Sequence, residues 1–159
     1  MRSLTLFAAG AVFGMLVIQL AAAPGDRAVA LSHVGISVAN FDESIKFYTK
    51  TMGFREAFTF RQPDGKPALT MLQISRDTFL EVTPSSPTQP AGCSHFAVEL
   101  PDINGTTAQL RQQGFKVNDP RPGRAGAPLT NVFDPDGIRV EMLQLVPESL
   151  HRKAMDAWK

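Results

Sequence analysis

The sequence has only one cysteine and almost no net charge, and each of these features excludes a class of protein. Its one cysteine, Cys93, excludes a disulfide within the chain, and we interpret this residue as small, apolar and buried rather than as a nucleophile. The formal net charge is only +1, and lysine and arginine are scattered rather than clustered. Nucleic-acid binding needs clustered cations, so no nucleic-acid partner is expected. A small neutral or anionic molecule is the expected ligand.

Charge is also absent from one long stretch near the N-terminus. Residues 4–23 are uncharged and mostly apolar, Arg2 precedes them, and the next charge is Asp26. A positive residue followed by an apolar run and small residues is typical of an export signal. The run is also about as long as a helix that crosses a bilayer. We therefore predict a signal peptide or an N-terminal membrane anchor at 1–23, a linker at 24–29, and a folded part that is periplasmic or secreted.

The rest of the chain is an internal repeat. Ser-His at 32–33 recurs at 94–95, and each copy is followed by an alternating apolar run, a helical stretch and Gly-Phe. Self-similarity at a fixed offset indicates a duplicated structural unit. We predict one domain at 30–146, with modules at about 30–83 and 93–145. A loop rich in proline and serine joins them.

Each module has the pattern strand, helix and three strands, which predicts an α+β domain of two tandem βαβββ modules. Alternating apolar residues mark the strands, and apolar residues at helical spacing mark the helices. The predicted strands are 34–38, 54–60, 68–75, 78–83, 93–100, 115–117, 129–133 and 138–145. The predicted helices are 42–52, with Ile45, Phe47 and Tyr48 facing inward, and 103–113.

A third helix is expected after the second module. Residues 147–159 are predicted to form a short amphipathic helix, with Leu150, Ala154 and Trp158 at helical spacing. This helix is expected to pack on the domain or on a second subunit, with His151 in solvent.

Two glutamates interrupt apolar strands at equivalent positions of the two modules. Glu81 follows His33 by 48 residues, and Glu141 follows His95 by 46. An unpaired carboxylate in an apolar strand loses favourable hydration. A divalent cation held by two neutral imidazoles and two carboxylates explains all four positions at once. The alternative is that the glutamates face solvent on edge strands and the histidines are core residues, although the chain has only three histidines and six glutamates.

These motifs together resemble a known family. SHVGISV, DESIKFYTKTMGF, FLEV, SHFAVEL and FDPDGIRVEML are similar to segments of the vicinal oxygen chelate superfamily, and more narrowly of its glyoxalase I-like members. The resemblance covers nearly all of 30–146. It implies the glyoxalase/bleomycin resistance/dioxygenase fold, in which paired modules form a cupped mixed sheet around a metal ion. It also implies that His33, Glu81, His95 and Glu141 are the metal ligands.

The resemblance implies a metal-dependent lyase or isomerase related to lactoylglutathione lyase. Four nitrogen and oxygen ligands leave two octahedral positions for a small-molecule substrate with adjacent oxygens. Such a substrate would lose a proton beside its carbonyl and pass through an enediolate, with Glu141 as the catalytic base. The divalent ion could be Ni, Zn, Co, Fe or Mn. A homodimer is the expected assembly.

Two positions depart from the members of the family that use glutathione. Those members carry arginine four residues after the first histidine and asparagine four residues after the first glutamate, where this chain has Ser37 and Ser85. Arg124, in the 122–128 loop, is a candidate substrate-binding residue for an anionic group. The expected chemistry is therefore that of glyoxalase I on a different substrate.

Two other functions remain open at this point. A non-haem iron dioxygenase of the same superfamily would use His33, His95 and Glu141 and leave Glu81 as a bystander. A non-catalytic member would bind a metal or a ligand without turnover. Oxygen consumption would favour the first, and saturable metal binding without proton exchange would favour the second.

Overall fold

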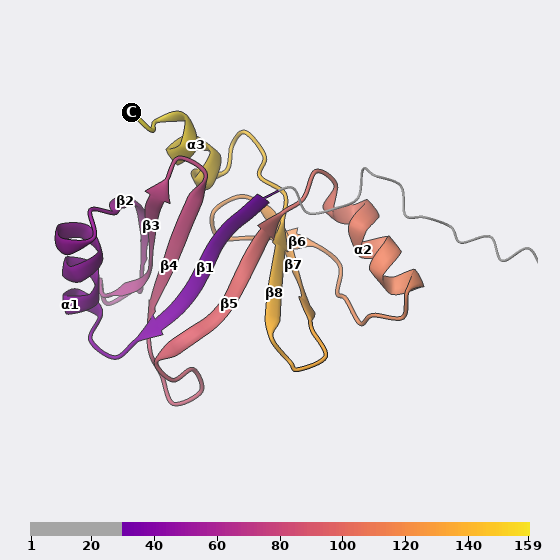
Figure 1. The fold of residues 1–159 in the computed structure, drawn as a ribbon, viewed down its shortest axis with the longest axis horizontal. Coiled ribbons are helices and arrows are strands. Elements are labelled where there is room, and N and C mark those ends of the chain that lie inside the picture. The colour runs from indigo at the N-terminus through magenta and orange to yellow at the C-terminus, as the bar shows by residue number, and fades with distance from the viewer. Residues whose placement is uncertain (1–29) are drawn as a thin grey trace, which may run out of the picture.

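The computed structural model describes residues 30–159. The predicted signal peptide or anchor at 1–23 and the linker at 24–29 lie outside the described residues. Among the described residues, eight strands form one sheet in the order β2-β3-β4-β1-β5-β8-β7-β6 (Figure 1). The strands are β1 Ala30–Val38, β2 Arg55–Arg61, β3 Pro67–Ser75, β4 Thr78–Pro84, β5 Gly92–Glu99, β6 Arg121–Pro122, β7 Pro128–Phe133 and β8 Arg139–Leu143.

The two modules join through their first strands, near the middle of the sheet. β1 pairs antiparallel with β5, whereas β1 pairs parallel with β4 and β5 pairs parallel with β8. The remaining neighbours are antiparallel. The sheet is therefore mixed, and the predicted α+β fold of two tandem βαβββ modules is confirmed. Each parallel pair puts a strand that carries a histidine beside a strand that carries a glutamate.

The helix of the first module begins one residue earlier than predicted. α1, Phe41–Lys46, starts there because the side chain of Asn40 caps it by accepting a hydrogen bond from a backbone amide. The helix continues as a π-helical segment, η1 Phe47–Thr51, which changes the phase of the helical face. Phe47, predicted to face inward, is 49% exposed, so that prediction was wrong. Ile45 and Tyr48 do pack against the sheet.

The second module departs from the prediction between its helix and β7. α2, Ile103–Gln112, is followed by irregular chain, and no strand forms at 115–117. The backbone oxygen of Val117 accepts a hydrogen bond from Nε of Arg111, and that of Asn118 accepts one from Oγ1 of Thr130. A side chain therefore binds the carbonyl at the end of the predicted strand, and the short strand that does form, the two-residue β6, begins four residues later.

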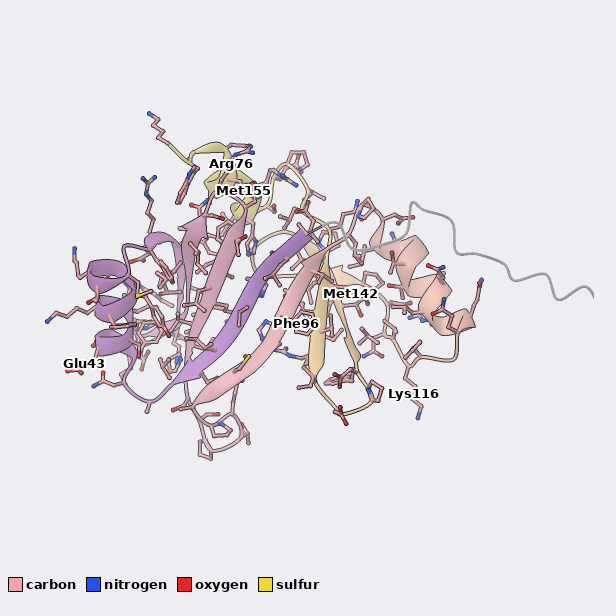
Figure 2. All side chains as sticks on the ribbon, in the orientation of Figure 1. Glu43, Arg76, Phe96, Lys116, Met142 and Met155 are labelled. Carbon is pink, nitrogen blue, oxygen red and sulfur yellow. The ribbon has the colours of Figure 1, made fainter. Side chains whose placement is uncertain are left out.

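The sheet buries a different apolar cluster on each face. On the outer face, α1 packs over the first module and α2 over the second, at opposite ends of the sheet in Figure 1. On the inner face, residues of both modules form one cluster with Met155 of α3, Leu150–Asp156. Met155 is labelled in Figure 2 where α3 covers the ends of β3 and β4. This shared cluster fixes the two modules relative to each other.

α3 packs on its own domain through a stripe one residue away from the predicted one. His151 and Met155 are 4% and 3% exposed, whereas Ala154 is only partly buried. The interpretation of His151 as a solvated residue was wrong, because its ring packs between those of Phe58 and Phe79. None of the described helices is both long and apolar enough to cross a membrane.

Candidate metal centre

Two rows of paired residues cross the middle of the sheet and determine the site. In the first row, Gly35 of β1 lies between Glu81 of β4 and His95 of β5. A Cβ atom at Gly35 would overlap with the imidazole of His95. The glycine therefore leaves the space above β1 in which the ring of His95 lies.

The second row has the same composition, as the repeat requires. Ala97 of β5 lies between His33 of β1 and Glu141 of β8. Gly35 and Ala97 follow the two histidines by two residues each, so a small residue separates each histidine from the glutamate of the other module. Because residues two apart on a strand face the same side, both rows project onto the inner face of the sheet.

The four predicted ligands converge within one chain. Nε2 of His33 lies 3.1 Å from Nε2 of His95. The same atom lies 3.8 Å from Oε2 of Glu81 and 3.6 Å from Oε1 of Glu141. His33, Glu81 and His95 each offer a ligand atom within 4.8 Å of the other two. The arrangement draws on both modules and needs no residue from a second subunit.

Burial keeps the two histidines of the site neutral. Burial, and secondarily His151, lowers the pKa of His33 well below its usual range. Burial, and secondarily Arg139, lowers the pKa of His95 to about 4. The contacts of His33 with the two glutamates are therefore not ion pairs at neutral pH, and each neutral ring has one unprotonated nitrogen.

The two glutamates share a region with no neutralising cation in direct contact. Burial, and secondarily the nearby carboxylate of Glu141, raises the pKa of Glu81 to about 7. Burial also raises the pKa of Glu141. Within residues 30–159, neither carboxylate has a lysine or arginine nitrogen within 4.0 Å. A divalent cation would supply the compensation that these two partly buried acids lack.

The donor atoms fit a divalent transition-metal ion. Two imidazole nitrogens and two carboxylate oxygens suit Zn, Ni, Co, Fe and Mn. Adjacent ligand atoms on one such ion lie about 2.8–3.6 Å apart, from octahedral to tetrahedral geometry, given metal–ligand bonds of about 2.0–2.2 Å. The separations from Nε2 of His33 run from 3.1 to 3.8 Å. His33, Glu81 and His95 are thus already placed to share one ion, whereas the side chain of Glu141, which lies outside this group of three, would have to move closer to join them.

The site opens into a cavity of about 430 Å³ on the inner face. Arg121, Arg124 and Arg139 line this cavity, together with Phe58 and Phe60. Among the described residues, none of these three arginines forms an ion pair with a carboxylate. Arg124 therefore lies where a substrate-binding residue is expected, and the cavity is more cationic than the sequence analysis anticipated.

Ser37, one of the two positions that differ from the glutathione-using members, is hydrogen-bonded by a residue of the loop between the modules. Nε2 of Gln89 donates a hydrogen bond of 2.6 Å to Oγ of Ser37. The hydroxyl of Ser37 also lies 3.2 Å from that of Thr83, and Ser37 is only 2% exposed. Gln89 itself lines the cavity. A short, buried hydroxyl with its own partners thus replaces the long cationic side chain of those members.

Three residues of the site were not predicted from the sequence. The positions of Gly35 and Arg139 could have been predicted, because each lies two residues from a proposed ligand on the same strand, His33 and Glu141 respectively, and therefore faces the same side. His151 had none, because α3 is distant in the sequence and meets the site only after folding. Its ring stacks on that of His33, with centroids 5.9 Å apart and planes 11° from parallel. Neither nitrogen of His151 has a hydrogen-bond partner within residues 30–159.

A second cavity of about 570 Å³ adjoins the first at Arg139, which lines both. Its walls include the exposed rings of Phe96 and Phe133 together with Ile138 and Cys93. Cys93 is exposed, so the prediction of a buried cysteine was wrong. Cys93 lies in the first part of β5, which pairs with β1 but precedes the pairing of β5 with β8.

Comparison with known proteins agrees with this geometry. The family model of the Glyoxalase/Bleomycin resistance protein/Dioxygenase superfamily matches residues 30–142. The chain belongs to this superfamily. The match covers both modules and extends past the last of the four predicted ligands, and the resemblance inferred from the motifs is confirmed.

Relatives in this superfamily include enzymes. A protein of Synechocystis sp. described as a probable lactoylglutathione lyase is 29% identical over 72% of this chain and 94% of its own length. The lactoylglutathione lyase of Neisseria meningitidis serogroup B is 27% identical over 72% of this chain and 89% of its own length. Among solved structures, methylmalonyl-CoA epimerase from Mycobacterium tuberculosis superposes with a TM-score of 0.66 at 21% identity, over 76% of this chain and 91% of that one. The last similarity shows the fold alone.

Proposed function

We propose that the protein is a metal-dependent lyase or isomerase of the glyoxalase I type. The observation that carries this proposal is the convergence of His33, Glu81, His95 and Glu141 on the inner face of one chain. Two neutral rings and two carboxylates with raised pKa values form a donor set for Ni, Zn, Co, Fe or Mn. The lactoylglutathione lyases among its relatives support the reaction type.

A bound divalent ion would polarise two adjacent oxygens of a substrate and acidify the neighbouring C–H bond. Glu141 is proposed as the general base that takes this proton and returns it to the adjacent carbon. Burial raises the pKa of the Glu141 carboxyl, which brings it closer to neutral pH, where a base is most effective. The side chain is 13% exposed and lies on the cavity wall, within reach of a substrate. Glu81 lies in the equivalent position of the first module.

The substrate is proposed to differ from the glutathione adduct of the relatives. Ser37 is buried and bound to Gln89, so it cannot grip a tripeptide as a long cationic side chain would. Arg124 is proposed to bind an anionic group of the substrate, since it lines the cavity without an ion-pair partner among the described residues. The glutathione hemithioacetal of methylglyoxal is therefore expected to be a poor substrate.

The dioxygenase alternative is less well supported by the geometry. It would leave Glu81 outside the ligand set, but Glu81 is one of the three residues whose ligand atoms all lie within 4.8 Å of one another.

We further propose that the folded part is exported and that it works as a homodimer.

The reaction is tested by hydrogen–deuterium exchange followed by NMR. The metal-loaded protein is incubated in D₂O with hydroxyacetone, dihydroxyacetone and glycolaldehyde, and exchange at the carbon beside the carbonyl is measured. Glu141→Gln should slow the exchange by about 10²–10⁴-fold, the usual contribution of a positioned base, because the amide keeps a coordinating oxygen but takes no proton. Glu43→Gln, on the exposed face of α1 (Figure 2), is the matched control and should exchange like the native protein. Undiminished exchange in Glu141→Gln would remove Glu141 from this role and make Glu81 the next candidate.

A further inference from the structure

Arg139 makes one contact that bears directly on metal binding. Its Nη2 atom lies 2.6 Å from Nδ1 of His95. A guanidinium group carries only donors, so Nδ1 of His95 must accept this hydrogen bond. In a neutral imidazole the proton then resides on the other nitrogen, Nε2. A ring whose Nδ1 accepts a hydrogen bond is neutral, so His95 carries a single proton.

The rest of the hydrogen-bond network agrees with this assignment. Nε2 of His95 faces Nε2 of His33 at 3.1 Å, so the protonated nitrogen of His95 donates and that of His33 accepts. The proton of His33 then lies on Nδ1, which is 3.4 Å from Oγ of Ser32. His33 thus has its lone pair directed toward the centre of the site. His95 directs a proton there instead.

These two tautomers have opposite consequences for a metal ion. A histidine binds metal through an unprotonated nitrogen and donates its other N–H to a neighbouring acceptor. His33 already meets this requirement through Ser32. His95 meets it only when its proton moves from Nε2 to Nδ1, where Oγ of Ser94, at 2.9 Å, is placed to accept it. The guanidinium of Arg139 cannot remain beside a protonated Nδ1, so it must leave when the metal binds.

Arg139, once released, would find no carboxylate other than Glu81 and Glu141 among the described residues that line the two cavities. It lies at the boundary of the two cavities, two residues before Glu141 on β8, and is partly exposed. Arg121 and Arg124 line the same cavity and also lack ion-pair partners among the described residues. With the glutamates engaged by a divalent ion, the cavity would carry three unpaired guanidinium groups. Such a cavity favours an anionic ligand.

We propose that Arg139 couples metal loading to the binding of an anionic substrate: it holds His95 in the tautomer that does not bind metal, and moves to a carboxylate or phosphate group of the substrate once the metal is in place. This inference rests on the proposed function and names its substrate class, an anion with two adjacent oxygens and one further acidic group. His95 itself neither gains nor loses a proton when its tautomer changes, because the proton only moves from Nε2 to Nδ1.

The tautomer of His95 is measured first, in the apo protein, by ¹⁵N NMR of the imidazole nitrogens. We expect the Nε2–H form in the native protein and the Nδ1–H form after addition of Zn²⁺. In Arg139→Met, the apo protein should shift toward the Nδ1–H form, with Ser94 as its partner. An Nδ1–H tautomer in the native apo protein would overturn the proposal without reference to any variant.

Metal affinity is measured next, by competition between the protein and a chromophoric chelator for Zn²⁺. Arg139→Met should bind Zn²⁺ about 3- to 10-fold more tightly than the native protein, because a competing hydrogen bond to the ligand has been removed. Arg121→Met removes the same charge from the same cavity without contact to His95 and is the matched control. Equal tightening in both variants would reduce the effect to long-range electrostatics and contradict the proposed contact.

Anion recognition is tested with two hydroxamates that chelate the metal in the same way. Acetohydroxamate has no further acidic group, whereas its analogue N-hydroxysuccinamate has a pendant carboxylate. On the Zn²⁺-loaded native protein, the carboxylate should improve affinity by about 10-fold, as expected for a charge-assisted hydrogen bond. Arg139→Met should lose most of this advantage, whereas Arg121→Met, which removes one charge from the same cavity, should lose clearly less of it. If the advantage persists in Arg139→Met while Glu141→Gln abolishes exchange, this inference fails and the proposed function stands.

Discussion

Gly35 on β1 pairs directly with His95 on β5, and the ring of His95 lies where a side chain at position 35 would be. This relationship links the strand pairing that joins the two modules to the geometry of the proposed metal centre. It also shows why a strand interior contains a glycine, which ordinarily weakens a strand.

The first prediction concerns this glycine. Gly35→Ala should displace the His95 ring and weaken metal binding by about 10- to 100-fold, the range seen when the support of a ligand is altered. The equivalent change in the second module, Ala97→Gly, removes a side chain and should leave metal affinity within about threefold of the native value. Titration of both variants with Zn²⁺ checks this. Native affinity in Gly35→Ala would show that His95 does not need this position to bind metal.

The second prediction concerns the pH dependence of metal binding. Both histidines are neutral well below pH 6, since burial lowers the pKa of His95 to about 4 and lowers that of His33 as well. Glu81, whose pKa is raised by burial to about 7, must instead lose a proton to bind metal. Affinity should therefore fall as pH decreases through 7, by about tenfold for each pH unit when one proton is displaced.

Glu81→Gln separates the carboxylate from the histidines in this titration. The amide does not titrate, so the profile of this variant should be much flatter between pH 5.5 and 8, although its affinity is lower. Zn²⁺ affinity is measured by competition with a chelator in both proteins. An unchanged profile in the variant would assign the proton to another ligand.

The third prediction uses the unpartnered imidazole of His151. A buried polar atom without a hydrogen bond costs about 1–3 kcal/mol, and both nitrogens of this ring lack a partner among the residues that the structure describes. His151→Phe keeps an aromatic ring against Phe58 and Phe79, so the apo protein should be as stable as the native protein or more stable. His151→Ala removes the ring and should lower the free energy of unfolding by about 2–4 kcal/mol. Similar losses in the two variants, measured by urea denaturation, would mean that the imidazole nitrogens are satisfied in solution.

The fourth prediction concerns the segment outside the described residues. If 1–29 is an export segment and linker, a chain that starts at Ala28 should fold and bind as much metal as the full chain. Gel filtration and metal analysis of the two proteins test this. Aggregation of the shorter chain, while the full chain remains dispersed in detergent, would show that the N-terminal boundary is placed too late.

Most of the fold and the four proposed ligands could be predicted from the internal repeat in the sequence. Equivalent His and Glu positions in two modules predicted which strands meet, because the strand period puts each His on the inner face. The sequence could not predict features that depend on contacts between distant segments. His151 is buried only because α3 packs on the inner face, and the carbonyl at the end of the strand expected at 115–117 is bound by the side chain of Arg111 instead of by a neighbouring strand. Arg139 could be placed on the inner face, but its contact with His95 depends on the pairing of β5 and β8.

The most direct test of the proposed metal centre is the metal content per chain, measured by elemental analysis of protein purified without an affinity tag. The native protein should hold one divalent ion per chain after loading with Ni²⁺ or Zn²⁺ and gel filtration. His33→Ala should hold almost none, because Nε2 of His33 lies within 4 Å of ligand atoms of the other three residues. Absence of metal from the native protein, or a full ion per chain in His33→Ala, would contradict the assignment of this site.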